Sequence, residues 1–402
     1  MPPLIVYAQE PLPIETTKSL MLAGPTPRGS SGLSWRAEAI EQLETLGYDG
    51  YVFVPEPRDG QWGRSYDAQI EWEENALNMA DCIAFWVPRD MSGDTYGGGC
   101  AMPALTTNDE WGSWKDSGKV VWGSPEWAEH TSYQKHYAKK LGVPGATTLL
   151  ATLRNAIEKV GEGALRRGGE CQVPLYIWRR PEFQGWLKMQ YDVGNRLDGC
   201  RVVWTFMVPP VAFNTSGKPP RNLFLYALHV DVYIASEDRH KINEIVILRP
   251  DITSVVLYRR DPDWLATKVA LVKEFRSPVR NFRGMVLELP GGSSKEKEAI
   301  ENVALHEVEE ETGLKIGVER LRFVGERQIA ATLSGHTANV FCAELLPDEM
   351  ALLEKMAADK VTHGVVADSE RTYIEVCRVA DVLNRSSVDW SMVGMIVTAL
   401  AP

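Results

Sequence analysis

Three glutamates at helical spacing are the residues in this sequence whose arrangement most clearly suggests chemistry. At 100° per residue these carboxylates continue an apolar stripe, so acidic and apolar side chains face the same way. The apolar positions are Ile300, Val303 and Ala304, and the acidic ones are Glu307, Glu310 and Glu311. Carboxylates crowded on an inward face are costly unless a cation compensates them, and their hard oxygens suit Mg²⁺. The pattern favours a divalent-metal site over the alternative, a solvated acidic helix face.

A loop followed by a helix is predicted to position these carboxylates. Residues 289–292, Leu-Pro-Gly-Gly, end an apolar run, and paired glycines permit a tight turn there. Helix-favouring residues follow from about Lys297, and Gly313 stands where the C-cap of a helix belongs. We therefore expect a glycine loop that leads directly into the acidic helix.

Residues 292–314 resemble the Nudix box, the signature of the Nudix hydrolases. The matching positions are Gly292, Glu298, Glu307, Val308, Glu310, Glu311, Gly313 and Leu314. His306 stands where the family has arginine. The resemblance implies that Glu307, Glu310 and Glu311 bind Mg²⁺ or Mn²⁺. It also implies hydrolysis of a nucleoside diphosphate linked to another group, with Glu307 or a loop residue as general base.

The segment before the box is most similar to that of the ADP-ribose and nucleotide-sugar pyrophosphatases. The likeness is carried by residues 272–279, Val-Lys-Glu-Phe-Arg-Ser-Pro-Val, and by residues 288–292. It implies that Arg276 and Glu288 contact substrate. His336 falls in a loop where those enzymes carry an acidic residue, so it is a candidate base, and the alternative is a histidine without a role.

An alternating strand–helix pattern fills the first part of the chain. Apolar strands are expected at 19–23, 51–55, 82–87 and 119–123, and helices at 35–47, 69–80, 133–140 and 146–160. Such alternation predicts an α/β fold with a doubly wound parallel sheet, whose site lies at the carboxyl ends of the strands. The loops at those ends are residues 24–29, 55–64 and 88–109.

Residues 15–160 resemble the nucleoside 2-deoxyribosyltransferases. The likeness is carried by Leu22-Ala23-Gly24-Pro25, by Ala80-Asp81 and by Glu110-Trp111-Gly112. It implies that Glu110 is a nucleophile, that Asp81 orients the sugar, and that Gly24, Pro25 and Arg28 contact substrate. A carboxylate below a sugar can stabilise or trap the oxocarbenium character that develops as an N-glycosidic bond breaks.

The pattern changes in the middle of the chain, which predicts two domains. We expect a deoxyribosyltransferase-like domain at 1–163, a polar, glycine-bearing linker at 164–172, and an α+β Nudix domain at 173–402. Residues 173–240 exceed what a minimal Nudix domain needs, so they form an extra sheet or a dimerisation element. A strand is expected at 175–178.

Composition limits the partners and the compartment. The chain has 402 residues, a formal charge of −11 and no apolar window of membrane-spanning length. The negative charge argues against a nucleic acid polymer, and the six scattered cysteines argue for reduced thiols without a zinc site. The first ten residues do not resemble a secretory signal. We expect a cytoplasmic homodimer that acts on a small nucleotide and not on a membrane.

The two resemblances together imply a bifunctional nucleotide-processing hydrolase. The Nudix part would cleave a nucleoside di- or triphosphate derivative, and the first domain would cleave or transfer the N-glycosidic bond of a nucleoside monophosphate. One alternative is an NAD glycohydrolase coupled to an ADP-ribose pyrophosphatase. Another is a ligand sensor in which one domain is catalytically inactive.

Overall fold

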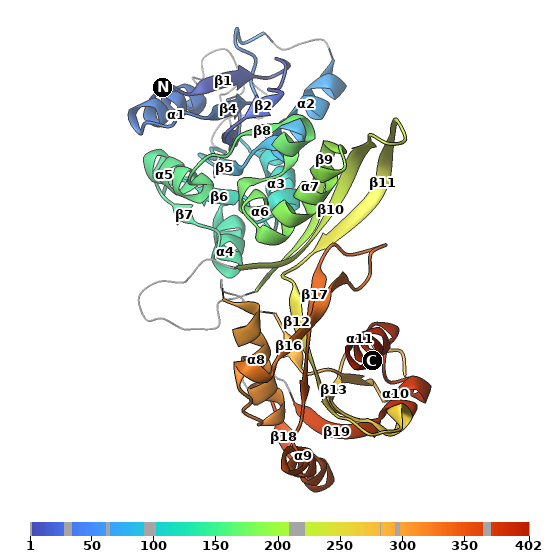
Figure 1. Ribbon diagram of the computed structural model, residues 1–402. Coiled ribbons are helices and arrows are strands. Elements are labelled where there is room, and N and C mark those ends of the chain that lie inside the picture. Colours follow the sequence, from blue (N-terminus) through green and yellow to red (C-terminus); the bar gives the residue numbers. More distant parts are fainter. Residues whose placement is uncertain are drawn as a thin grey trace. The chain divides into compact units, whose positions relative to one another are not determined.

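The computed structural model describes residues 2–27, 34–61, 65–91, 102–208, 222–281, 283–293, 298–364 and 371–401 (Figure 1). The chain forms two compact units, Met1–Leu248 and Arg249–Pro402. The boundary between the units follows Leu248 and does not coincide with the linker predicted at 164–172. No helix among the described residues is long and apolar enough to cross a membrane.

A six-stranded parallel sheet organises the first unit. Its order is β1-β4-β3-β5-β6-β7. The strands are β1 (Leu4–Tyr7), β3 (Ser19–Ala23), β4 (Tyr51–Val54), β5 (Cys82–Trp86), β6 (Val120–Gly123) and β7 (Gly145–Ala146). The chain passes from β3 to β4 on one side and then to β5 on the other. In sheets with such a reversal, ligands bind beyond the carboxyl ends of the strands on either side of it, here β3 and β5.

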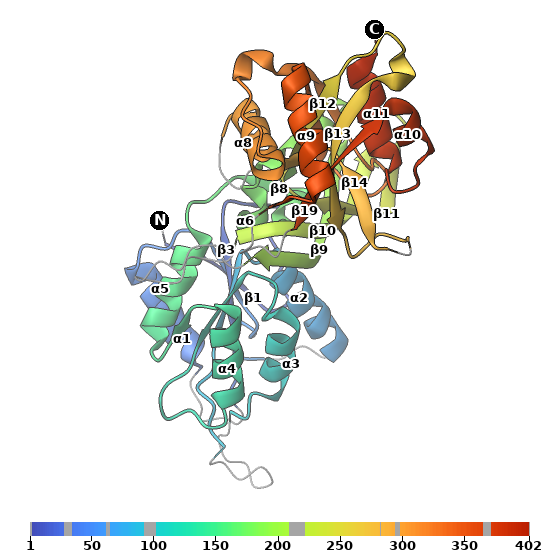
Figure 2. The same ribbon diagram turned by 90° about the horizontal axis from the view of Figure 1, so that it is seen from below.

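Helices cover both faces of this sheet, as the strand–helix alternation predicts. Leu20 and Leu22 of β3 pack with α1 (Trp35–Thr45) and α5 (Leu149–Val160), whereas Met21 and Ala23 face the opposite layer. That layer contains α2 (Tyr66–Met79), α3 (Leu105–Trp114) and α4 (Ser132–Leu141). Figure 2 shows α1 and α5 together, apart from α2, α3 and α4. The doubly wound arrangement is confirmed, but α3 lies partly within a segment predicted to be loop.

Residues 164–248 belong to the first unit. The strand β8 (Arg166–Arg167) pairs with β2 (Glu15–Thr16), and the 3-10 helix η1 (Gly168–Gln172) follows, so the predicted linker is built into this unit. Two helices come next, α6 (Leu175–Trp178) and α7 (Pro181–Asp192). Residues 175–178, predicted to be a strand, are therefore helical. The prediction was wrong because a short apolar run fits both a strand and a buried helix. An antiparallel sheet β11-β10-β9 completes the unit, from β9 (Arg196–Val208), β10 (Asn222–Ile234) and β11 (Arg239–Leu248).

An eight-stranded mixed sheet forms the centre of the second unit, with β16-β17-β12-β13-β19-β18 in order, β14 beside β13 and β15 beside β12. Strands β12 and β17 are parallel. The strands are β12 (Ile252–Arg259), β13 (Lys268–Phe275), β14 (Met285–Glu288), β15 (Gly291–Gly292), β16 (Arg322–Gln328), β17 (Thr337–Glu344), β18 (Thr362–His363) and β19 (Thr372–Arg378).

Alternation along β12 explains how helices cover this second sheet. Val255 and Leu257 pack with α8 (Ile300–Thr312) and α9 (Pro347–Asp359). Val256 and Tyr258 face the other side, which α10 (Val379–Asn384) and α11 (Trp390–Leu400) cover. Successive side chains of a strand point to opposite faces, so this one strand contributes to both cores. The fold is thus mixed α/β, with a parallel sheet in the first unit and a mixed sheet in the second.

Candidate functional sites in the two units

The predicted acidic helix is α8. It ends at Gly313, whose φ of 72° is left-handed and whose N–H donates to the carbonyl of Glu309. Val303, Ala304 and Val308 of this helix are buried in the core. The predicted helix and its glycine C-cap are confirmed, and the apolar stripe points inward as expected.

Two of the predicted carboxylates lie against the glycine pair of β15. The N–H of Gly291 donates to Oε2 of Glu311 over 3.0 Å. A Cβ added to Gly292 would lie 2.3 Å from Oε1 of Glu307. Glu307 and Glu311 are four residues apart and so share one side of the helix. The spacing and the glycine pair therefore place two carboxylates side by side at the start of the box.

The third carboxylate, Glu310, lies apart from this pair. Its Oε2 is 3.6 Å from Nδ1 of His306, a residue whose side chain is 73% exposed. Among the described residues no group of three or more acidic, histidine or cysteine side chains is already arranged to hold a metal ion. The donor chemistry nevertheless fits a hard divalent cation, since the carboxylates lie on adjacent turns and Glu311 is nearly buried. Glu310, the residue before Glu311, is the third candidate ligand.

Arg276 and Glu288, the two residues expected to contact substrate, lie next to each other. Arg276 follows β13 and Glu288 ends β14, and the two strands pair. The guanidinium lies 3.0 Å from Oε2 of Glu288 and 2.8 Å from Oε2 of Glu274. Burial lowers the pKa of Arg276, but the charges of Glu288, Glu274 and Glu311 outweigh that effect and raise it. A permanent cation is thereby held next to the α8 carboxylates.

The first unit contains a second carboxyl pair, formed by Glu110 of α3 and Glu73 of α2. Both line a groove of about 680 Å³, whose walls include residues of α2, α3 and β9. Burial raises the pKa of Glu110 to about 7, and the charge of Glu73 adds to that effect while Arg36 opposes it. Burial also raises the pKa of Glu73, which accepts a hydrogen bond from Gln69. Perturbed carboxyl groups in a groove are typical of functional sites.

Arg36 is the cation whose charge lowers the pKa of Glu110. It is buried in α1, and it donates to the carbonyls of Leu22 and Gly24 and to the carboxylate of Glu56. These partners stand at or just beyond the carboxyl ends of β3 and β4, so the charge that acts on Glu110 comes from the edge where the site was predicted.

Two of the three predicted substrate-loop residues are described in the structure. A Cβ on Gly24 would lie 2.1 Å from the carbonyl oxygen of Trp86, so glycine allows the loops after β3 and β5 to meet. The carbonyl of Pro25 accepts a hydrogen bond from the Trp35 indole. Arg28 lies outside the described residues.

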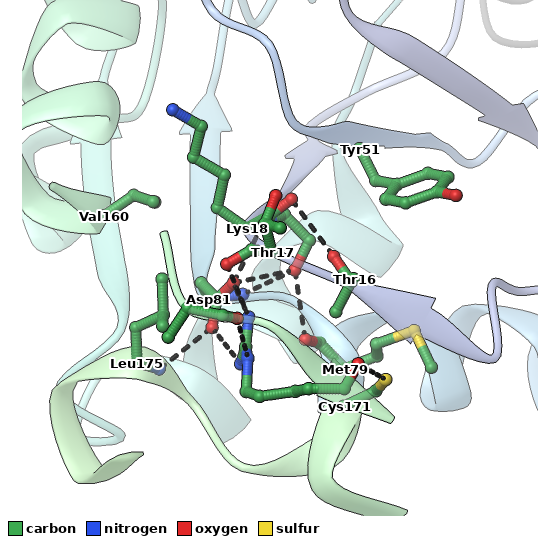
Figure 3. A network of polar contacts seen from close by, with 12 residues as sticks. Thr16, Thr17, Lys18, Tyr51, Met79, Asp81, Val160, Cys171 and Leu175 are labelled. Atoms are coloured by element: carbon green, nitrogen blue, oxygen red, sulfur yellow. Dashed lines mark hydrogen bonds and ion pairs between the residues drawn. The ribbon is translucent and has the colours of Figure 1, made fainter. Parts of the chain in front are cut away.

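Asp81 has a different role from the one predicted. Its carboxylate is buried and accepts two hydrogen bonds from Arg166, at 2.7 and 2.6 Å. The backbone N–H groups of Ser19 and Leu175 also donate to it (Figure 3). Asp81 precedes β5 and so lies at the amino edge of the sheet, about 15 Å, one strand length, from the carboxyl edge. Asp81 does not line the groove that contains Glu110.

Glu73 is the residue that the sequence interpretation missed. It shares a stripe of α2 with Gln69, Ala76 and Leu77, of which all three are buried. A carboxylate on a buried helical stripe is the same signal that identified α8, and it could have identified Glu73.

Comparison with known proteins supports the assignment of the second unit. Residues 248–383 match the family model of the NUDIX domain. The match starts at the observed division between the units and contains α8, β15, Arg276 and Glu288. It supports a hydrolase that acts on a nucleoside diphosphate linked to another group, with a small nucleotide as substrate. No curated protein matches the chain. In the first unit the parallel sheet is present, and the deoxyribosyltransferase relationship stays a prediction.

Proposed function

We propose that residues 249–402 cleave the pyrophosphate bond of a nucleoside di- or triphosphate derivative, with Mg²⁺ or Mn²⁺ as cofactor. The observation that carries this proposal is the position of Glu307 and Glu311 against Gly291 and Gly292, within the region that matches the NUDIX domain. Two carboxylates held against a glycine pair offer hard oxygen ligands for a divalent cation.

The side chains around this pair have complementary roles in the proposal. Glu307, Glu310 and Glu311 would hold the metal, which when bound neutralises the diphosphate and lowers the pKa of a water molecule. Arg276 would donate hydrogen bonds to the phosphate oxygens, because a guanidinium matches their geometry. Glu288 would orient Arg276 through the hydrogen bond that it accepts at 3.0 Å.

A substrate panel tests this function. The protein is incubated with nucleoside triphosphates, ADP-ribose and nucleotide sugars, with either Mg²⁺ or EDTA, and the products are separated by chromatography. We expect a nucleoside monophosphate, accompanied by a sugar phosphate from ADP-ribose or a nucleotide sugar, only in the presence of metal. Equal cleavage in EDTA would contradict the proposal.

We propose a second activity for the first unit, cleavage or transfer of the N-glycosidic bond of a nucleoside monophosphate. The observation that favours it is the Glu73–Glu110 pair in the groove. Ionised Glu110 would attack C1′ of the sugar, and the electron pair of the broken C1′–N bond would pass to the base. Water or an acceptor base would then release the sugar from Glu110. Glu73, which lies in the same groove as Glu110, would hydrogen-bond to the substrate.

The test of this second activity uses the same protein without metal. A carboxylate nucleophile requires no cation, so EDTA should stop pyrophosphate cleavage and leave release of the base from a monophosphate unchanged. Base release that is lost in EDTA and restored by Mg²⁺, with the monophosphate supplied directly, would contradict the role of Glu110.

A further inference from the structure

The loop before β17 reaches the same sheet edge as the box. Gly292 of β15 and Asn339 of β17 pair with Thr253 of β12 from opposite sides. Two strand spacings place these outer residues about 10 Å apart. His336 comes three residues before Asn339, in the loop that leads into β17. It therefore lies at the sheet edge where β12 and β17 begin and β15 ends.

Arg249 connects this loop electrostatically to the box. The residue precedes β12, and its Nη2 lies 2.9 Å from Oγ of Ser293, which follows the glycine pair. The positive charge of Arg249 also acts on His336, and the charge of Arg276 acts on Arg249. The charges of Arg249 and Arg276 and the ring of His336 thus act on one another at this edge of the sheet, and the two guanidinium groups suit an anionic diphosphate.

Ser334 fixes the ring of His336. Its Oγ is hydrogen-bonded to Nδ1 of His336 and also accepts the backbone N–H of His336. When Nδ1–H donates to Oγ, the other nitrogen, Nε2, is the one that can accept a proton. Ser334 is itself buried, so the ring is held by a side chain with little freedom.

The surroundings of His336 favour its neutral form. The ring is partly buried, Arg249 faces it with a positive charge, and Asp251 faces it with a negative one. Burial lowers the pKa of His336, Arg249 lowers it further, and Asp251 opposes them. A neutral imidazole at pH 7 can accept a proton, whereas an imidazolium cannot.

We propose that His336 is the general base of the pyrophosphate cleavage, which rests on the function proposed for the second unit. As the oxygen of water forms a bond to phosphorus, its proton passes to Nε2 of His336. The bond from phosphorus to the bridging oxygen breaks, and its electron pair leaves with the departing phosphate. Glu307 then remains a metal ligand, and Ser334 acts as a positioning residue that sets the tautomer.

The test compares His336→Gln with His363→Gln, a control at a partly buried histidine of β18. We expect His336→Gln to lower kcat about 100-fold or more with nearly unchanged KM, and to remove the acidic limb of the pH–kcat profile. Ser334→Ala should shift that limb and lower kcat less. An NMR titration of the metal-free protein should show the His336 ring titrating below the ordinary histidine pKa, with folding confirmed in the same spectra.

Three results would contradict the inference. His336→Gln could keep kcat within about threefold of the wild type, it could raise KM alone, or it could retain the acidic limb. If Glu311→Gln still abolished turnover in any of these cases, the proposed function would survive without His336 as base. A wild-type protein without metal-dependent cleavage would overturn both proposals.

Discussion

Oε1 of Glu307 lies so close to the backbone of Gly292 that a Cβ at that position would be only 2.3 Å away. The glycine is therefore required by the carboxylate and not only by the turn of the chain. The same strand donates its Gly291 N–H to Glu311 over 3.0 Å. The loop and the helix are therefore coupled, because a substitution in either of them displaces a carboxylate.

Gly292→Ala tests this dependence. The new methyl group must displace the Glu307 carboxylate, so we expect weaker Mg²⁺ binding and turnover at least about tenfold lower, with little loss of stability. Metal titrations monitored by calorimetry and by rate would measure this. Gly394→Ala is the control, since nothing lies within 4 Å of that Cβ and alanine is favoured within α11. Equal metal affinity in Gly292→Ala and the wild type would contradict the geometry.

Asp81→Ala is expected to destabilise the first unit without acting on the chemistry directly. Removal of one partner of a buried ion pair leaves the Arg166 charge uncompensated, which typically costs about 3–5 kcal/mol. Urea-induced unfolding would measure the loss. The neighbouring pair Arg167–Glu15 is exposed, so Arg167→Ala should change stability little. If both variants unfolded at the same urea concentration as the wild type, the structural role of Asp81 would be wrong.

The raised pKa of Glu110 predicts a pH dependence of stability. An acid whose pKa is about 7 in the folded state and near 4.5 when unfolded binds more protons when folded between those values. The free energy of unfolding should therefore decrease as the pH rises through this range, by about 3 kcal/mol at most. Glu110→Gln should remove most of this decrease, whereas Asp109→Asn should change it little, because Asp109 is exposed and makes the smallest contribution to the raised pKa. Unfolding measured from about pH 5 to pH 8 would show it, and identical slopes in Glu110→Gln and the wild type would contradict it.

Glu110→Ala should also reveal the order of the two proposed reactions. If pyrophosphate cleavage comes first, the variant should convert a nucleoside di- or triphosphate to the monophosphate and stop. If base release comes first, it should leave NAD intact and still split added ADP-ribose. Chromatography of the products distinguishes these results, because the substitution leaves every residue of the second unit unchanged. A variant that frees base from either substrate would exclude Glu110 as the nucleophile.

The sequence predicted those features that depend on local periodicity and on glycine. The stripe through Ile300, Val303 and Ala304 and the C-cap at Gly313 predicted α8, and the apolar run of β3 gave its bounds. Such signals are contained in adjacent residues, so a single sequence displays them.

Features that depend on distant partners were not predictable in the same way. Asp81 pairs with Arg166, which comes much later in the chain, and Glu73 meets Glu110 from another helix. The position of Asp81 before its strand already indicated the amino edge of the sheet. The 175–178 segment was assigned to a strand because four apolar residues fit either structure, and tertiary contacts decided for a helix.

The most direct test of the metal-dependent function compares Glu311→Gln with Glu309→Gln. Glu311 lies against the glycine pair, whereas Glu309 is on the exposed side of the same helix and pairs with Lys315. Rates of pyrophosphate cleavage would be measured across a Mg²⁺ titration, with the circular dichroism of both variants as a control for folding. We predict a loss of at least about 100-fold at saturating Mg²⁺ for Glu311→Gln and little change for Glu309→Gln. Wild-type turnover in Glu311→Gln at saturating metal would contradict the assignment of the site.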